Sequence, residues 1–579
     1  MGLMLAGTAQ APVMAKSHTT TAKGRAIEMR ADRAVLYPQR MELKEDESLG
    51  DVLAMYPDLM QSGFADMLSG YNVRIDNVAI NGDMRIVCRQ LKANMINTIQ
   101  ICDNTAVAKG TTGLNRVIDI TLRRGNQGGN AQGRNSQKQG KNAPGSQVLS
   151  GLAGVEAGTD NLADIHAVVR YDAPKTDVIA ISSYSYQDID DYIRQKQHLF
   201  AHMTNYFSPH DRLLTYVSQS YQNDRIYSGN NKEKRQNEKL LARARYFHKF
   251  NDKGTELLLV GSYQYGYIPY TLDPDVNSDP LHSTKNDATL FIVELNIPLT
   301  QKLSMMAGWE GDFSYSRYTG DRLAGGSLDR PRNKYTASNN DLYLQFNYLT
   351  GIWRFTVGDR VMFYHYSTKG NTADSYAHHQ DMKHNDTRNN IEASVIASIT
   401  GHSQIQAAYH RKFINPSYAV EKPLSYENWL DIKQGLVAKN IDETKLGYTY
   451  TQSNFNLSLA AYYQMIEHDN NRCKLSASAF YRTGILALTA GANLYTEKGD
   501  GNDYATFHLN PRFSLPWQMA LNIQSVFTAG NLKLLDDQHV YLSGQLTKQL
   551  SKHWNGAIEW HDICSKHYSA AMATVQYLF

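Results

Sequence analysis

The chain ends in the stretch Tyr568-Ser569-Ala570-Ala571-Met572-Ala573-Thr574-Val575-Gln576-Tyr577-Leu578-Phe579. Counting back in twos from the last residue places an apolar set on one face of an extended strand: Phe579, Tyr577, Val575, Ala573 and Ala571. The other face includes Gln576 and Thr574. A strand that crosses a membrane takes about 9–11 residues, apolar toward lipid and mixed toward a lumen. The stretch therefore predicts a strand that ends at a membrane interface. If it stood alone, an edge strand of a soluble sandwich would be an equal alternative.

The composition of the 579 residues suits many strands that each have one polar face, with 37 Tyr and 40 Gly against only 15 Pro. No run of about 18 consecutive apolar residues occurs, which excludes a helical membrane protein. The formal net charge of +3 provides no basic field for a polyanion, so nucleic acid is not an expected partner.

From Gln147 to the end, the pattern predicts about 22 strand-like segments separated by gaps that alternate in length. One set of gaps is very short, as at 173–175 and 350–351. The other set is long, and we expect loops at 223–235, 267–287, 318–334, 366–385 and 413–439. Alternating short turns and long loops is typical of an up-and-down outer-membrane barrel whose short turns face the periplasm.

Side chains alternate along these segments as a closed barrel in lipid requires. In one segment, four residues are expected to face lipid: Phe291, Val293, Leu295 and Ile297. Glu294 and Asn296 are then expected to face the lumen. A second segment gives the same pattern, with an outward set of Phe455, Leu457, Leu459, Ala461, Tyr463 and Met465. About 22 tilted strands enclose a lumen wide enough to need a plug.

Residues 41–124 have a different pattern, that of a compact α/β domain. A helix with the spacing Leu-x-x-Val-Leu-x-x-x-Pro begins at Leu49 and is stopped by Pro57. An Ile-Asp strand at 73–77, a Leu-x-Ala-x-x-Ile helix within 89–96 and a Val-Ile-Asp-Ile strand at 116–123 follow, with a further strand at 98–101. This order resembles the plug domain of TonB-dependent outer-membrane receptors. The resemblance implies a transmembrane β-barrel of about 22 antiparallel strands with a small N-terminal α/β plug domain inside the lumen.

We expect five segments along the chain. They are a partial signal-peptide-like segment at 1–15, a mobile periplasmic arm at 16–40, the plug at 41–124, a flexible linker at 125–146 and the outer-membrane barrel at 147–579. Receptors of this family carry a coupling segment on the arm, for which residues 26–30 are only a weak candidate. The aromatic terminus at Phe579 resembles the signal by which outer-membrane barrels are recognised for assembly.

The four cysteines form no Cys-x-x-Cys pair, so neither a zinc motif nor a redox motif is indicated. Cys88 and Cys102 are close in sequence and could pair in an oxidising periplasm. Two buried free thiols are the alternative, and the sequence leaves both open.

No nucleophile triad, phosphate loop or paired-carboxylate motif can be argued from spacing, so we expect no catalytic residue, no enzyme activity and no cofactor. His378, His379 and His384 cluster with a thioether and a carboxylate, a set that can bind copper, zinc or haem iron. A solvated surface loop is the alternative interpretation of this segment.

A second candidate site follows the turn at 415–417, which resembles an Arg/Asn-Pro-Ser turn of the receptor family before a long loop and a returning strand. Tyr418, Tyr426 and Trp429 on this loop are candidate groups for stacking on a ligand, although they could equally pack within the loop. In the plug, the resemblance places residues 77–85 facing the ligand, which gives Asn81, Asp83 and Arg85 as candidates.

The resemblance implies a receptor of the bacterial outer membrane for energy-coupled, TonB-dependent uptake of a scarce solute. Its expected partners are outer-membrane lipid, an inner-membrane TonB-type energy coupler and a small-molecule ligand. Loops of moderate length that carry Tyr and His favour an iron chelate, haem or another metal complex, although short oligosaccharides and peptides would also stack on Tyr. The alternative is a plugged barrel without coupled transport, acting as an adhesin or as the partner of a surface lipoprotein.

Overall fold

The computed structural model of the chain describes two stretches, each with gaps. In the amino-terminal stretch it describes residues 27–29, 33–41, 49–53, 71–75, 78–79, 91, 93–102 and 116–122. From 148 to 578 it describes all residues except 160, 190, 229–230, 253, 273–281, 321, 325–326, 330–331, 372–381, 415–438, 453, 468–470, 498–502, 533–538, 552 and 565–569.

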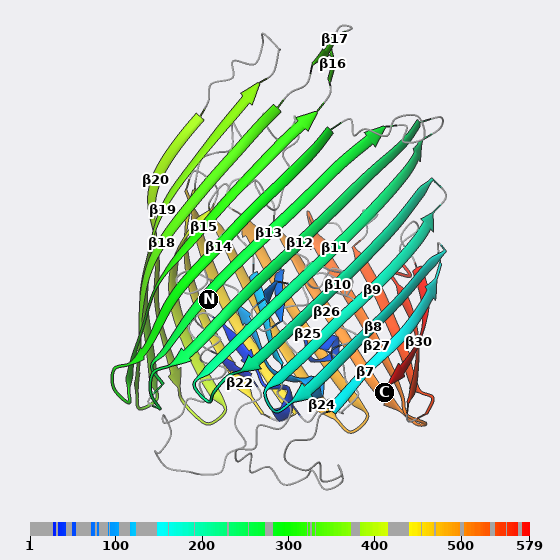
Figure 1. Ribbon diagram of the computed structural model, residues 1–579. Helices are drawn as coiled ribbons and strands as arrows, with labels where there is room; N and C mark the ends of the chain where they lie inside the picture. The colour runs from blue at the N-terminus through cyan, green and yellow to red at the C-terminus, as the bar shows by residue number, and fades with distance from the viewer. Residues whose placement is uncertain are drawn as a thin grey trace.

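Twenty-two antiparallel strands of the described chain form a closed barrel (Figure 1). β30 pairs with β7 to close it, with Val575 opposite Val155. The strands are β7 (Val148–Gly158), β8 (Leu162–Ala173), β9 (Thr176–Ile189), β10 (Tyr192–Tyr206), β11 (Asp211–Ser228), β12 (Asn231–Lys249), β13 (Glu256–Leu272), β14 (His282–Pro298), β15 (Leu303–Gly320), β18 (Arg332–Thr350), β19 (Trp353–Asn371), β20 (Met382–Ser398), β21 (Ser403–Ile414), β22 (Lys439–Thr451), β23 (Phe455–Ile466), β24 (Arg472–Thr483), β25 (Leu486–Glu497), β26 (Tyr504–Leu515), β27 (Met519–Gly530), β28 (Val540–Gln549), β29 (Trp554–His561) and β30 (Ala570–Leu578). A small hairpin of β16 (Arg322–Ala324) and β17 (Ser327–Asp329) lies between β15 and β18. The predicted strand number and antiparallel topology are confirmed.

The lengths of the connections differ between the two ends of the barrel, as the sequence predicted. Every connection at the end where β8 meets β9 is short, and this end corresponds to the periplasm. At the opposite end the lengths vary, and the expected loop at 223–235 is wrong, because β11 and β12 continue through it with Asn223 opposite Gln236. Strand segments that project beyond lipid need no apolar face, so this stretch, in which polar residues dominate, has the pattern of a loop. β21 ends at Ile414 and β22 begins at Lys439, so the expected loop at 413–439 lies almost wholly outside the described residues.

The barrel wall is taller on one side. Barrel strands from β11 to β20 contain 17 to 19 residues each. Those from β21 to β30 contain 8 to 13. Figure 1 shows the long strands rising well above the rest of the wall.

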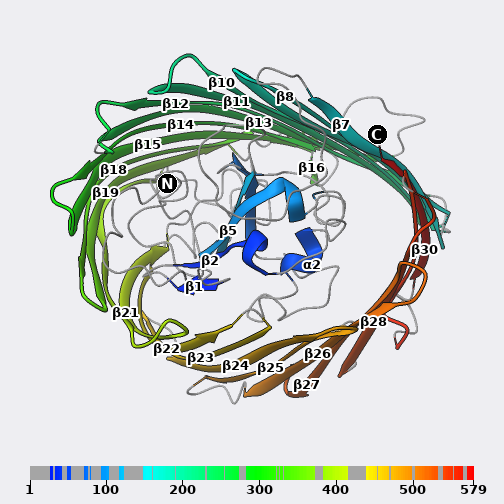
Figure 2. The same ribbon diagram turned by 90° about the horizontal axis from the view of Figure 1, so that it is seen from below.

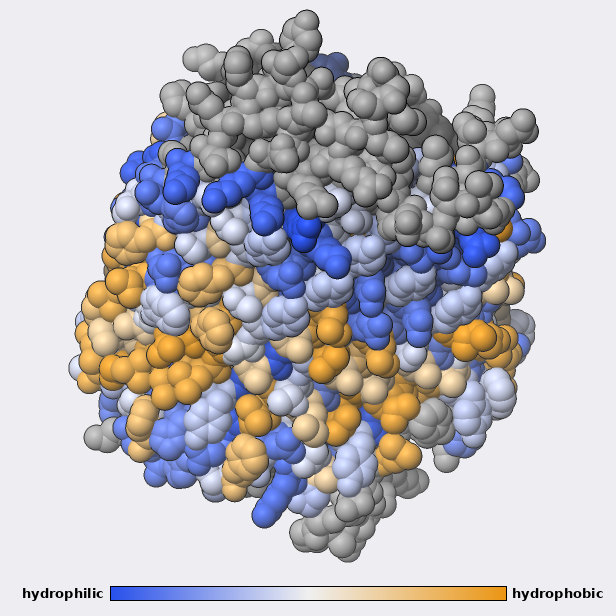
Figure 3. Space-filling view, turned by 45° about the horizontal axis from the view of Figure 1, so that its top comes forward, coloured by the Kyte–Doolittle hydropathy of each residue, from blue (hydrophilic) through white to orange (hydrophobic). Residues whose placement is uncertain are grey.

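The outer face of the barrel is apolar around its middle. Phe291 and Val293 are 47% and 43% exposed, whereas Glu294, which follows Val293, is 0% exposed and faces inward. Leu459, Tyr463 and Met465 are likewise exposed on β23. Figure 3 shows the resulting apolar band between more polar zones. The predicted alternation is therefore confirmed, and the band is the surface that a lipid bilayer would cover.

A six-stranded mixed sheet lies inside the ring of barrel strands, as the view from below shows (Figure 2). In chain order its strands are β1 (Ile27–Met29), β2 (Ala34–Leu36), β3 (Tyr71–Ile75), β4 (Val78–Ala79), β5 (Ile96–Cys102) and β6 (Arg116–Leu122). Three short helices accompany it: η1 (Pro38–Arg40), α2 (Leu49–Leu53) and η3 (Ala93–Met95). No helix in the described part of the chain is long and apolar enough to cross a membrane.

Two features of this plug sheet differ from the expected arrangement. β1 and β2 belong to the sheet although they precede the expected start of the plug at Met41, because Ala34, Val35 and Leu36 are apolar enough to be fully buried. In the range 89–96, where a helix was expected, the described residues 93–95 form the 3-10 turn η3, and β5 already begins at Ile96. Cys88 lies outside the described residues, so the pairing of Cys88 with Cys102 stays open. Cys473 and Cys564 are exposed free thiols.

The plug shares one apolar core with the barrel wall. Plug residues such as Leu49 and Ile120 belong to the same buried cluster as Val168, Phe200 and Tyr216 of β8, β10 and β11. Apolar residues on the inward face of a large barrel would otherwise line a wet lumen. The wall from β7 to β12 is therefore shaped as a docking surface for the plug.

Candidate functional site in the barrel lumen

A network of buried charges lies on neighbouring strands of the lumen wall. Arg360 of β19 is fully buried and donates hydrogen bonds to Glu310 of β15 at 3.0 Å and Asp341 of β18 at 2.8 Å. Its guanidinium lies 4.5 Å from the centroid of the Tyr343 ring, and the Tyr343 hydroxyl donates to Glu294 at 2.8 Å. Buried charges persist where they are paired and hydrogen-bonded. The network is therefore a fixed part of the wall.

A second set of contacts fastens the plug at the periplasmic end. Arg354, near the start of β19, donates from both terminal nitrogens to Glu28 Oε1 at 3.2 Å. Tyr37 donates to the other oxygen of Glu28 at 3.1 Å. On β24, Arg482 donates to the Met41 carbonyl at 3.4 Å. These polar contacts hold β1 and the end of η1 against the barrel wall.

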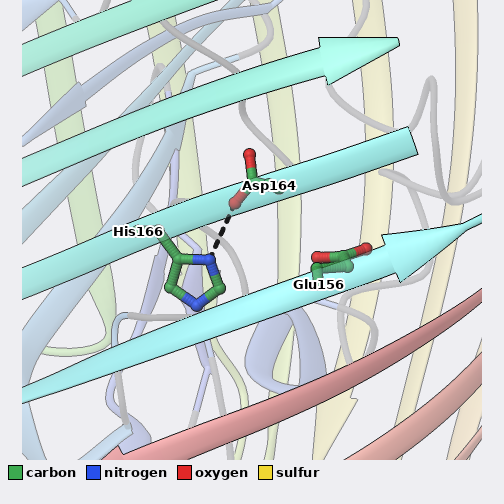
Figure 4. Close-up of side chains that lie close together, drawn as sticks. All are labelled: Glu156, Asp164 and His166. Atoms are coloured by element: carbon green, nitrogen blue, oxygen red, sulfur yellow. Dashed lines mark hydrogen bonds and ion pairs between the residues drawn. The ribbon is translucent and has the colours of Figure 1, made fainter. Parts of the chain in front are cut away.

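A third cluster faces the lumen close to the connection between β7 and β8, at the end opposite the short turns (Figure 4). Glu156 of β7 stands directly opposite Asp164 of β8. His166 lies two residues further along β8, and its Nδ1 is 2.8 Å from an Asp164 carboxylate oxygen. The three residues are 7%, 5% and 4% exposed, respectively. One ligand atom from each lies within 4.8 Å of those of the other two.

Gly154 makes this arrangement of the imidazole possible. It is the cross-strand neighbour of His166, and a Cβ at residue 154 would overlap His166 Nε2. The side-chain nitrogen of Gln576, on β30, lies 3.4 Å from the same ring nitrogen. The ring is therefore held over Gly154, between β8 and β30.

Most of the predicted site residues lie outside the described residues. These are Asn81, Asp83 and Arg85 of the plug, Tyr418, Tyr426 and Trp429 of the long loop, and His378 and His379. His384 is on β20 opposite Tyr366, and so belongs to a strand. Their roles in binding a ligand stay predictions.

The cluster of Glu156, Asp164 and His166 is not among the sites predicted from the sequence. Asp164 and His166 are two residues apart, so a strand places them on one face, and that spacing was the available signal. Glu156 joins them only through the register of β7 against β8, which depends on the connection between the two strands.

Comparisons with known proteins place the fold. The sequence matches no family model and no curated protein. Solved structures that are similar over nearly the whole chain include the alcaligin outer-membrane receptor FauA of Bordetella pertussis (13% identity, 97% of this chain and 100% of that one, TM-score 0.63). The siderophore receptor PiuA of Acinetobacter baumannii is similar at 11% identity, over 98% and 100% of the two chains, with a TM-score of 0.65. The copper transporter OprC is similar at 10% identity, over 94% and 99%, with a TM-score of 0.64.

This is the fold of the TonB-dependent outer-membrane receptors. The resemblance predicted from the sequence is confirmed at the level of fold, with the plug sheet inside a 22-stranded barrel. TonB-dependent receptors bind small-molecule ligands and work with an inner-membrane coupler, and the named neighbours are receptors and a transporter. The apolar band and the closed barrel agree with the predicted location in the bacterial outer membrane.

Proposed function

We propose that the chain is an outer-membrane receptor for energy-coupled uptake of a scarce solute, namely an iron chelate, haem or another metal complex. The observation that carries the proposal is the plug sheet packed inside the closed barrel, with one apolar core shared between them. A lumen that holds a packed plug transmits a solute only when the plug moves. The names of the similar structures, an alcaligin receptor, a siderophore receptor and a copper transporter, support the ligand class.

In this proposal each of the five predicted segments has its own role. Residues 1–15 direct export, and 16–40 form the arm, within which β1 and β2 join the plug sheet. Residues 41–124 form the rest of the plug, 125–146 link it, and 147–579 span the membrane. β1 is the edge strand of the plug sheet and contains most of the candidate coupling segment, residues 26–30. An exposed sheet edge can accept an added strand from a partner. A TonB-type coupler that pairs with this segment would pull directly on the sheet it must displace.

Ligand capture would fall to groups facing the outer end of the lumen. The predicted contacts are the loop residues Tyr418, Tyr426 and Trp429, and the plug residues Asn81, Asp83 and Arg85. Aromatic rings stack on flat chelates, and the plug groups supply hydrogen bonds and charge. The predicted metal contacts are His378, His379 and His384, the last of which is on β20.

Uptake by whole cells tests the proposal. A strain that lacks the chain is compared with one that expresses it, each with and without the inner-membrane coupler, using labelled ferric chelate, haem, copper and a glycan. Accumulation of a metal compound that needs both the chain and the coupler is the expected result. Surface binding without accumulation would favour the adhesin or lipoprotein-partner alternative, and accumulation of the glycan alone would overturn the ligand class.

A further inference from the structure

We propose that Glu156, Asp164 and His166 bind a divalent transition-metal ion at the outer end of the lumen wall. The site would be separate from the predicted histidines of residues 378–384, because it lies on β7 and β8. Two carboxylates and an imidazole are a donor set that Zn²⁺ and Cu²⁺ accept. Binding at this site does not depend on uptake and is measured on the isolated protein.

The geometry is close to that of a coordinated ion. Zn²⁺ holds oxygen and nitrogen ligands at about 2.0–2.2 Å, which places the ligand atoms themselves about 3–3.5 Å apart. The three ligand atoms here already lie within 4.8 Å of one another. All three residues are on two paired strands of a closed barrel, so small side-chain rotations complete the shell without moving the backbone.

The electrostatics of the wall favour a cation at this place. Glu156 and Asp164 are directly opposite each other on neighbouring strands, and like charges in that position destabilise a strand pair. An ion bound between the two carboxylates would attract both of them. The contact of Asp164 with His166 Nδ1 orients the imidazole toward the same space.

A neighbouring hydroxyl points to the same conclusion. Thr574 of β30 is the other cross-strand neighbour of Glu156, and it is buried on the inward face of the wall. In the described structure its Oγ1 makes no hydrogen bond. A water molecule that completes the coordination shell would supply the partner that this hydroxyl otherwise lacks.

Metal binding to purified protein tests the proposal. The folded chain in detergent is stripped of metal and titrated with Zn²⁺ by calorimetry and with Co²⁺ by visible absorption. The background variant carries His378→Ala, His379→Ala and His384→Ala, so that the predicted loop site does not contribute. We expect one ion per chain and a Co²⁺ spectrum that includes nitrogen ligation.

Three variants locate the ion. His166→Gln and Asp164→Asn should each weaken Zn²⁺ binding by more than the roughly 10–100-fold that loss of an outer-shell partner costs. Gly154→Ala keeps all three ligands but displaces the imidazole through its new Cβ, so it should weaken binding as well. His198→Gln removes another buried histidine, which contacts Ser218 on the lumen wall, and should leave binding unchanged.

Folding of each variant is verified by the heat-dependent mobility shift of the barrel in gel electrophoresis. If the folded background protein binds no ion, the proposal is wrong. It is also wrong if His166→Gln and Asp164→Asn bind Zn²⁺ with the stoichiometry and affinity of the background protein.

Discussion

At the scale of the residue, the stability of the lumen wall depends on individual buried charged side chains. Arg360 is the clearest case, because its guanidinium faces two carboxylates and an aromatic ring, which lie on β15 and β18. Removing one partner of a buried pair is costly since it leaves the other charges without compensation. The loss of stability on replacing Arg360 therefore depends on the charged partners that are left buried.

Arg360→Leu should destabilise the folded barrel by about 3–5 kcal/mol, because Glu310 and Asp341 are left facing each other in a buried place. The measurement is the urea concentration at which the heat-modifiable form is lost. Adding Glu310→Gln and Asp341→Asn to the variant should recover most of the loss. Unfolding of Arg360→Leu at the wild-type urea concentration would contradict the assignment of the network.

Glu28 should behave differently, because its contact with Arg354 is partly exposed and such pairs contribute about 0–1 kcal/mol. Glu28→Gln should leave barrel unfolding unchanged but increase hydrogen exchange across residues 27–36 several-fold, since β1 loses its fastening to the wall. Arg354→Gln should have the same effect, and the double variant should add little. Unchanged exchange in both single variants would mean that the pair does not hold β1.

At the scale of the element, each barrel strand is specified by the alternation of its side chains, and this is why strand number and lipid-facing residues could be predicted. A strand such as β23 has an apolar outward face throughout, so its pattern has period two. The upper parts of β11 and β12 are paired but polar on both faces, and the same method predicted a loop there. Apolar and polar side chains alternate only where one face of a strand contacts lipid. Beyond the bilayer this alternation is lost, and strands can no longer be recognised from it.

Leu459→Arg tests the lipid-facing assignment at the middle of β23. An Arg on the lipid face at the bilayer midplane costs about 2–4 kcal/mol, so the yield of folded, heat-modifiable barrel should fall. Ser458→Arg, on the neighbouring inward position, is the matched control and should fold at close to the wild-type yield. Equal losses in the two variants would mean that the two faces are assigned wrongly.

At the scale of the whole molecule, the plug and the barrel are one packed unit, and the conductance of the pore reports on it. Deleting residues 27–145 removes the plug sheet and the linker while leaving the barrel strands intact. In planar bilayers the full chain should conduct little, and the deletion should open a large, stable channel, because about 22 strands enclose more space than their own side chains fill. Equal conductance of the two proteins would contradict the position of the plug in the lumen.

The sequence was enough to predict the plugged barrel, but not the cluster of buried ligand groups that the structure shows. The fold follows from repeated local patterns, whereas sites such as the one formed by Glu156, Asp164 and His166 depend on register between strands. A shift of one residue in the pairing of β7 with β8 would turn Glu156 to the lipid. The segments singled out for ligand binding lie mostly outside the described residues, so the structure leaves those predictions untested.

The tall side of the wall has a consequence for immune recognition. Residues 223–235 are mostly part of a paired ladder that reaches from Asn223 opposite Gln236 to Ser228 opposite Asn231. Antibodies raised against the native surface would therefore recognise a twisted two-stranded epitope, with side chains of both strands in fixed alternation. A linear peptide of these residues would be a poor immunogen, and a hairpin cross-linked at a pair of facing positions would be the better mimic.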